Sequence, residues 1–298
     1  MSLVSDVTPF LQAADDKAAA LELSLAERDA AITARDATIA SLRAQLAAIT
    51  PPPPPPVASN GFTTLPTGWT RTLFADDFTG DLSKWNVRDN TTQDNMDGIN
   101  FARNCTVKDS VLSIRTGADS GNAAKPWSCG YLDTKGGKFS ARNGRFEARM
   151  RFPWGANATG FWPAFWLRPD DGGDGEIDGM EAWPARNELG FTIHHDYLST
   201  AAHVKQNPYR LPTPLTIDPR AWHTYSIEKE PGSLRFYIDD VLYSDMTNVS
   251  WRVATLERAV NWHFRLNLQI GGSWGGKPNA QTDLTQTFDI DWVRVLAR

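Results

Sequence analysis

Six consecutive prolines, Pro51 to Pro56, divide this chain of 298 residues into two parts that cannot share one continuous element. Proline fixes φ and lacks a backbone N–H donor, so the run interrupts helices and sheets alike. It predicts a polyproline II spacer of roughly 19 Å, at about 3.1 Å per residue, with a disordered tether as the alternative. In either case we place a linker at residues 50–60, between an N-terminal segment, 1–49, and a C-terminal domain, 61–298.

The segment before the prolines has the pattern of one long α-helix, from about Pro9 to Ile49. Thr8 is a suitable N-cap with proline at the first helical position, and no glycine occurs before Gly61. Apolar residues recur every seven positions, which is the spacing of a coiled-coil seam. The two columns of this seam are Leu11, Ala18, Leu25, Ile32, Ile39 and Leu46, and Ala14, Leu21, Arg28, Arg35, Leu42 and Ile49.

The seam predicts an α-helical coiled coil, so we expect the chain to form a homo-oligomer through residues 9–49. Arg28 and Arg35 lie at seam positions, where they weaken a two-stranded coiled coil and leave the number of chains open. The alternative is a single amphipathic helix packed on the C-terminal domain.

After the linker the period changes from that of a helix to the alternation of β-strands. In residues 144–152 and 263–270, apolar residues at every second position alternate with polar ones. The apolar sets are Phe146, Ala148, Met150 and Phe152, and Phe264, Leu266, Leu268 and Ile270. Many such segments predict an all-β domain of two sheets packed as a sandwich.

Three carboxylates occur within six residues, at Glu176, Asp178 and Glu181, in a segment with the pattern of a strand. Alternation points the first two to one face, and a β-bulge at Gly179 would bring Glu181 to the same face. Such a trio suits hydrolysis of a glycosidic bond, in which one carboxylate attacks the sugar and another protonates the leaving oxygen. The alternative is a calcium site, because clustered acids bind hard cations.

From about Phe74 to the C-terminus, the chain resembles glycoside hydrolase family 16, which includes laminarinases, lichenases, agarases and carrageenases. Seven segments match in the family's order, and the fourth to seventh follow the acids. They are residues 143–149, 161–166, 175–181, 222–225, 236–239, 266–274 and 289–295. The chain departs from the family at Gly179, where an aliphatic residue is usual.

The resemblance implies a concanavalin-like jelly roll with a substrate cleft across its concave sheet. It also implies an endo-acting, retaining hydrolase of a β-linked polysaccharide, of the β-glucan or galactan class, that needs no cofactor for catalysis. Glu176 would then be the nucleophile, Glu181 the general acid/base and Asp178 the assistant between them.

Aromatic and polar residues near the acids are candidates for substrate binding. Tryptophan faces stack on sugar rings, although most of the 12 tryptophans must be core residues. By resemblance, a cleft histidine and an aromatic platform add to this set. The candidates are Trp162, Trp166, Trp183, His194, Arg149, Asn267, Gln269 and Trp274. The strand arginines Arg145, Arg149, Arg151 and Arg265 could meet an anionic glycan.

Composition argues against several other classes of partner. The net charge is −5, whereas binding of nucleic acid calls for clustered Lys and Arg. No apolar run approaches ~18 residues, so we expect no membrane insertion. Residues 1–6 lack a basic segment and an apolar core, so we expect no signal peptide.

Two features stay open at this point. Cys105 and Cys129 either form a disulfide or remain buried thiols, and their spacing fits no metal motif. By resemblance, Asp291 and the region near Asp77 could hold a structural calcium ion on the convex face.

A hydrolase on an oligomerising stem without a signal peptide fits a component of a larger particle, such as a bacteriophage tail. We therefore expect it to act outside the cell, for example on a virion tail, and otherwise to be cytoplasmic. The chief alternative is a non-catalytic, multivalent glycan-binding module, since linked sites gain avidity without turnover. A structural spacer is a third reading.

Overall fold

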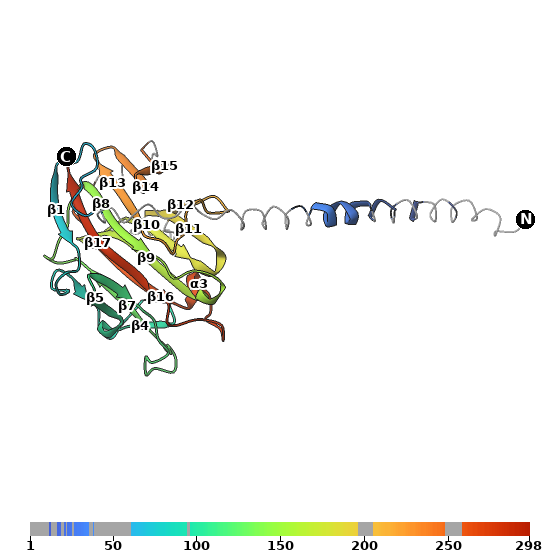
Figure 1. The fold of residues 1–298 in the computed structure, drawn as a ribbon, viewed down its shortest axis with the longest axis horizontal. Helices are drawn as coiled ribbons and strands as arrows, with labels where there is room; N and C mark the ends of the chain where they lie inside the picture. The colour runs from blue at the N-terminus through green and yellow to red at the C-terminus, as the bar shows by residue number, and fades with distance from the viewer. Residues whose placement is uncertain are drawn as a thin grey trace, which may run out of the picture. The chain divides into compact units, whose positions relative to one another are not determined.

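The computed structural model describes residues 61–298 except 94–95, 196–204 and 248–257. Before them it describes positions 12, 17, 18, 21, 23–25, 27–35 and 38. The chain divides into two compact units, Met1–Ala58 and Ser59–Arg298, and each is considered by itself (Figure 1).

In the first unit, every described position is helical and exposed. Leu21, Leu25 and Ile32, which belong to the predicted seam, expose 56%, 55% and 47% of their surface. The remaining positions of the predicted helix 9–49 and the whole predicted linker 50–60 lie outside the described residues, so the coiled coil stays a prediction. Within the described part of the chain, no helix is long and apolar enough to cross a membrane.

The second unit contains an eight-stranded antiparallel sheet with the order β15-β14-β13-β8-β17-β6-β5, and β1 pairs with β17. Its strands are β1 (Arg71–Asp76), β5 (Cys105–Lys108), β6 (Val111–Ile114), β8 (Gly144–Arg151), β13 (His223–Glu230), β14 (Ser233–Ile238), β15 (Val241–Asp245) and β17 (Phe288–Ala297). The longest of them, β17 with ten residues, lies between β8 and β6.

A nine-stranded sheet faces it, with the order β12-β11-β10-β9-β16-β7-β4-β3 and with β2 beside β7. Its strands are β2 (Asn86–Val87), β3 (Thr91–Thr92), β4 (Gly98–Asn100), β7 (Trp127–Asp133), β9 (Phe161–Pro169), β10 (Glu176–Trp183), β11 (Glu188–His195), β12 (Lys205–Arg210) and β16 (Trp262–Ile270). All pairs are antiparallel except β4 with β7. A short helix, α3 (Gly272–Gly275), follows β16, and 3-10 turns cover Ala102–Asn104, Ala156–Ala158 and Pro184–Arg186.

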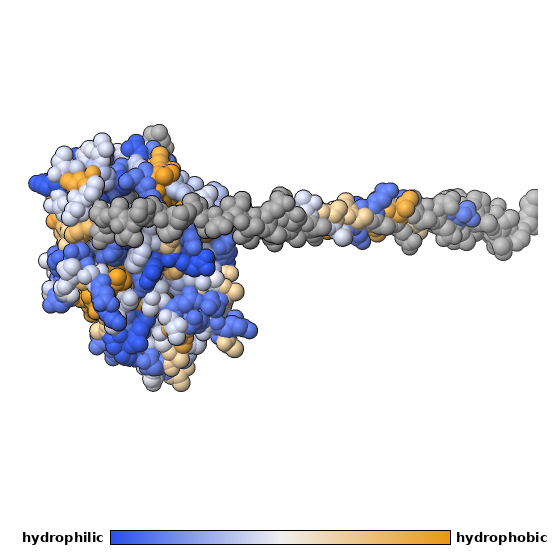
Figure 2. Space-filling model, viewed as in Figure 1, coloured by the Kyte–Doolittle hydropathy of each residue, from blue (hydrophilic) through white to orange (hydrophobic). Residues whose placement is uncertain are grey.

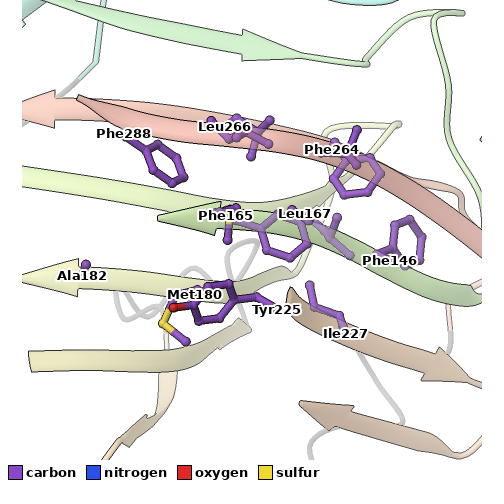
Figure 3. Packing of buried hydrophobic residues seen from close by; sticks show 14 of the residues in the cluster. Phe146, Phe165, Leu167, Met180, Ala182, Tyr225, Ile227, Phe264, Leu266 and Phe288 are labelled. Atoms are coloured by element: carbon purple, nitrogen blue, oxygen red, sulfur yellow. The ribbon is translucent and has the colours of Figure 1, made fainter. Parts of the chain in front are cut away.

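The hydrophobic core lies between the two sheets, as the alternating patterns predict. Phe146 and Met150 of β8 and Phe264 and Leu266 of β16 are fully buried in one cluster (Figure 3). The rings of Phe146 and Phe165 both lie 5.5 Å from that of Phe264. On the face seen in Figure 2, hydrophilic residues dominate the sandwich surface and hydrophobic ones form small patches. The prediction of an all-β sandwich is therefore confirmed.

The outward face of the eight-stranded sheet buries a cluster of charges, which we call the outer charge cluster: Arg145, Glu147, Glu228 and Arg294. Arg145 donates to Glu147 at 2.5 Å and to Glu228 at 2.9 Å, and Arg294 donates to Glu147 at 2.5 Å. The Nη1 atom of Arg294 also donates to the carbonyls of residues 61, 62 and 64, at 2.7 to 2.9 Å. Arg294 therefore fastens the start of the domain to β17.

The two cysteines are separate thiols. Cys105 and Cys129 are both buried and free. Burial raises the pKa of each thiol to about 12, so neither is ionised at neutral pH and both behave as small apolar side chains.

Candidate active site

The predicted β-bulge is present in β10. On the neighbouring strand β9, the consecutive residues Trp166 and Phe165 pair with Asp178 and Met180, which leaves Gly179 as the extra residue. The pairing of β10 with β11 shifts at the same place. One inserted residue reverses the alternation for the rest of the strand.

The bulge places the three acids on one face of the nine-stranded sheet. Glu176, Asp178 and Glu181 all line a single cavity of about 600 Å³. Ile177 and Met180 point to the other face, where they are fully buried in the core. The alignment of the acids thus follows from one local irregularity in the backbone.

Gly179 is required by lack of space. A Cβ atom added there would lie 2.6 Å from Cδ1 of Ile227 and 2.9 Å from Cε1 of Phe165. Both contacts are shorter than van der Waals distance, and Ile227 belongs to β13 of the opposite sheet. The departure from the family is therefore matched by a neighbour that fills the volume of the missing side chain.

Most of the predicted substrate-binding residues line this cavity with the acids. Strands β9, β10, β11 and β16 and the helix α3 contribute them. They are Trp162, Trp166, Trp183, His194, Asn267, Gln269 and Trp274. The cavity is also lined by Thr192 and Arg210, which no sequence motif singled out.

Arg149 is the exception, and its predicted place in the cleft is wrong. It lies on β8 of the eight-stranded sheet, and its Nη1 atom is 2.5 Å from Oδ2 of Asp291. Arg145 and Arg151 lie on the same strand. Of the four strand arginines that could meet an anionic glycan, only Arg265 belongs to the sheet that carries the cavity.

Glu181 is held by two neutral donors inside the cavity. Trp162 Nε1 donates to one carboxyl oxygen at 3.0 Å, and the Thr192 hydroxyl donates to the other at 2.8 Å. Only 5% of the residue is exposed. Burial, with a smaller contribution from the nearby charge of Asp178, raises the pKa of Glu181 to about 8. The group therefore carries a proton at neutral pH.

The other two acids form a cluster with one histidine and one arginine. His194 Nε2 lies 3.1 Å from Asp178 Oδ2 and 3.6 Å from Glu176 Oε1, and Arg168 Nη1 lies 3.5 Å from Glu176 Oε2. Burial raises the pKa of Asp178 well above its ordinary value, and the charge of Glu176 adds to this effect. The side chain of Glu176 is 18% exposed against 5% for Asp178, so Glu176 is the more accessible of the two.

Aromatic residues border the acids on both sides. Trp162 and Trp274 lie with ring centroids 6.1 Å apart, and Trp274 is 40% exposed. The guanidinium of Arg210 lies 4.1 Å from the centre of the Trp183 ring, and it also donates to the Thr192 hydroxyl at 3.3 Å. These flat faces suit sugar rings that stack across the cavity.

Two amides beside the cavity are already bound to other protein groups. Asn267 accepts a hydrogen bond from Trp166 Nε1 at 2.6 Å, and Gln269 donates to Asn100 at 3.0 Å. These hydrogen bonds fix the orientations of the Trp166 ring and of the Gln269 amide.

The alternative of a metal site at the acids is disfavoured by the donor set. Among the described residues, Glu176, Asp178 and His194 are the one group of three possible ligands whose donor atoms gather within 4.8 Å. Calcium prefers six to eight oxygen ligands, whereas this group offers two carboxylates and a nitrogen beside Arg168.

The described carboxylates also give no support to a structural calcium ion at Asp291 and Asp77. Asp291 forms an ion pair with Arg149, and Asp77 accepts a hydrogen bond from the Thr79 hydroxyl at 2.8 Å. Neither belongs to a group of three possible ligands among the described residues.

Comparison with known families gives a match over most of the second unit. The sequence profile of Glycosyl hydrolases family 16 matches residues 85–294. The chain belongs to glycosyl hydrolases family 16. The family's chemistry needs no cofactor, and the resemblance drawn from the sequence motifs is confirmed.

Several known proteins are similar to this chain. "Glucan endo-1,3-beta-glucosidase A1" of Niallia circulans is 28% identical over 259 residues, which cover 75% of this chain and 37% of that protein. "Beta-glucanase" of Rhodothermus marinus is 30% identical over 181 residues, covering 53% and 59%. The matched region thus spans well under two thirds of either curated relative. The solved laminarinase of Rhodothermus marinus aligns with a TM-score of 0.61 at 27% identity, over 76% of this chain and 97% of that one.

Proposed function

We propose that this protein is an endo-acting, retaining glycosidase that cleaves a β-linked glucan. The observation that carries the proposal is the bulge at Gly179, because it turns Glu181 into the cavity that Glu176 and Asp178 already line. Three acids aligned among tryptophans have no purpose in a protein that only binds neutral sugar. Family membership supports the same reaction class.

In the first step, a carboxylate oxygen of Glu176 attacks the anomeric carbon while the bond to the leaving sugar breaks. The leaving oxygen takes the proton of Glu181, whose pKa of about 8 keeps that proton available at neutral pH. Trp162 Nε1 fixes the direction of the carboxyl group.

In the second step, Glu181 acts as a base. It takes a proton from water, the water oxygen attacks the anomeric carbon, and Glu176 leaves as a carboxylate. The raised pKa of Asp178 favours its protonated form, which can donate a hydrogen bond to the Glu176 carboxylate each time it is released, and His194 contacts both acids.

The names of the relatives support a β-1,3-linked glucan as substrate, since two of them are a glucan endo-1,3-beta-glucosidase and a laminarinase. The test is release of reducing sugar from β-1,3-glucan, mixed-linkage β-glucan, cellulose and agarose. Glu176→Gln should abolish release. The matched control is Glu230→Gln on β13 of the other sheet, which removes an exposed partner of Arg298 and should leave the rate unchanged.

A chain that releases no sugar from any polymer but still binds one of them tightly would overturn this proposal. That result would favour the non-catalytic, multivalent glycan-binding module. The acids would then contribute no turnover, and Glu176→Gln would leave the affinity unaltered.

We also propose that residues 9–49 form a coiled-coil stem that joins several copies of the chain. Support comes from the exposed apolar positions Leu21, Leu25 and Ile32, which follow the predicted heptad columns on helical backbone. Light scattering on the full chain should give a multiple of the monomer mass. Ile32→Glu together with Leu25→Glu should give the monomer, and a monomeric parent chain would overturn the stem.

Display on a larger particle, such as a bacteriophage tail, and action outside the cell remain part of this proposal. A stem with a proline spacer would hold several catalytic domains near an anchored polymer and raise their effective concentration. Detection of the protein in purified particles by antibody labelling would support it. Recovery only as free protein would contradict it.

A further inference from the structure

We propose that the end of the cavity next to Trp166 recognises an oxyanion, so that the substrate is an anionic β-glycan that carries carboxylate or sulfate ester groups. The residues that would bind it are Arg265 and Arg168, with Arg88 behind them. This inference rests on the proposed function, because it names the substrate class of the same cavity.

Arg265 faces the side of the sheet that carries the cavity. Its neighbours Phe264 and Leu266 are fully buried in the core, so alternation points Arg265 the other way. Its guanidinium lies 4.6 Å from the ring centre of Trp166, which lines the cavity. In the strand register, Trp166 pairs with Arg265 on one side and with Asp178 on the other. Arg265 on β16 is thus separated from the catalytic acids on β10 by one strand, β9.

The orientation of Arg265 is fixed from behind. Its Nε atom donates to His263 Nε2 at 3.0 Å, and Nδ1 of the same histidine lies 2.8 Å from Asp170. Burial, followed by the charge of Arg265, lowers the pKa of His263 to about 4, so the ring is neutral and can accept this hydrogen bond. The hydrogen bond to His263 uses the Nε atom of Arg265, so both of its Nη groups are still available to donate to a ligand. Among the described residues, neither Nη group donates a hydrogen bond and no carboxylate forms an ion pair with Arg265.

Two more arginines lie near it. Arg168, on the adjacent strand, is 3.5 Å from Glu176, and Arg88 binds Asp133 at 2.9 Å. Burial lowers the pKa of Arg265, and the charges of Arg88 and Arg168 act in the same direction. A part-buried cation beside two others costs free energy that an anionic ligand would offset.

The positive charge is local to this end of the cavity. The chain as a whole carries −5, so a group of three arginines does not reflect a basic protein. The acids do not neutralise all of it, since Asp133 is already bound to Arg88 and burial raises the pKa of both Asp178 and Glu181, which disfavours their charged forms. A guanidinium whose two Nη groups are both available can donate to two oxygens of one oxyanion.

The test measures affinity separately from turnover. The full-length Glu176→Gln protein is titrated by calorimetry with a soluble β-1,3-glucan, its carboxymethyl ether and its sulfate ester, all of matched length. At low ionic strength, where screening is weakest, we expect one or both anionic polymers to bind about tenfold tighter than the neutral one. The two derivatives distinguish carboxylate from sulfate recognition.

Variants then assign the site. Arg265→Gln in the Glu176→Gln protein should remove about tenfold of the affinity for the preferred anionic polymer, and Arg168→Gln should lower it as well. Arg265→Lys keeps the positive charge but lacks the planar guanidinium, so its affinity for the anionic polymer should lie between those of the Arg265 protein and Arg265→Gln. An intermediate affinity shows that the loss in Arg265→Gln does not come from a failure to fold. The matched control is Arg235→Gln on β14 of the other sheet, an exposed arginine paired with Asp245, which should change nothing.

The outcomes separate this inference from the proposed function. Equal affinity for neutral and anionic polymers, or a preference that survives both Arg265→Gln and Arg168→Gln, overturns the inference even if neutral glucan is hydrolysed. Arginine-dependent selectivity in a protein that hydrolyses no polymer supports the inference and overturns the glycosidase.

Discussion

Both sheets of the sandwich bury carboxylates on their outward faces, but they treat these groups in opposite ways. On the eight-stranded sheet, Glu147 is fully buried and lies 2.5 Å from both Arg145 and Arg294. On the nine-stranded sheet, Glu181 is 5% exposed, and among the described residues its hydrogen-bond donors are one indole and one hydroxyl.

The difference distinguishes a carboxylate that stabilises the fold from one that can transfer a proton. A buried carboxylate that is paired with arginines stays ionised and holds strands together. A buried carboxylate without such a partner keeps its proton to higher pH, which is what a general acid requires.

Glu181→Gln should have the largest effect, because it removes the transferable proton without a change of shape. We expect the turnover rate to fall by about 10² to 10⁴-fold, as is usual for loss of a general acid. The fold should persist, which circular dichroism can verify. A rate within a factor of ten of the parent's would contradict the assignment of Glu181.

The pH dependence follows from the raised pKa of Glu181. The acid must be protonated to act, so the rate should fall as the pH rises through about 8. Because its folded pKa lies above the ordinary value of 4.5, Glu181 also contributes stability that is complete below pH 4.5 and is lost as the pH rises through about 8. Denaturant titrations between these limits should show a larger loss in the parent than in the Glu181→Gln protein, which keeps only the contribution of Asp178.

Arg294→Met tests the paired face. It removes one partner of the buried Glu147 and three hydrogen bonds to residues 61, 62 and 64. The free energy of unfolding should fall by ~3–5 kcal/mol, with the turnover rate of the folded protein unchanged. Arg235→Met, which breaks an exposed ion pair, should cost at most about 1 kcal/mol. Equal losses from the two variants would show that burial does not matter here.

Gly179→Ala tests the space that aligns the acids. The new methyl group would meet Ile227 at 2.6 Å, so we expect a loss of about 1–3 kcal/mol and a lower rate as Glu181 shifts. Ile227→Ala removes both atoms that would clash, Cδ1 and Cγ1, at a cost of about 2–5 kcal/mol by itself. In the double variant the two losses should not add. Strict additivity would mean that the two residues do not compete for space.

Thr192→Val should have the smallest effect. Its hydroxyl favours the ionised form of Glu181, so its removal should raise the pKa of Glu181 further. The alkaline limb of the rate profile should then move to higher pH. Thr216→Val is a matched control, because that hydroxyl is exposed and binds Tyr243 at 3.2 Å. An unchanged limb would remove Thr192 from the site.

Much of this arrangement follows from local sequence. Alternation in residues 144–152 and 263–270 identifies the core-facing side chains, because strand geometry fixes which neighbours share a face. The acids and their bulge are also local, since the extra residue lies between Asp178 and Met180 in one strand. These features could be predicted without knowledge of the other sheet.

The rest depends on contacts between distant segments. Alternation gives a face but not the sheet, which is why Arg149 was placed in the cleft although it lies on the opposite layer. Thr192 reaches Glu181 only through the pairing of β10 with β11. Likewise, no local pattern reveals that Ile227 fills the space beside Gly179.

Arg294 also decides where a mechanical load would enter the domain. A pull on the chain before Gly61 reaches the sandwich through the carbonyls that this arginine holds, and hence through β17 of the eight-stranded sheet. The acids lie on the other sheet, beyond a core whose apolar contacts have no fixed direction. A load on that segment would therefore enter the sandwich at β17, on the sheet opposite the acids of β10.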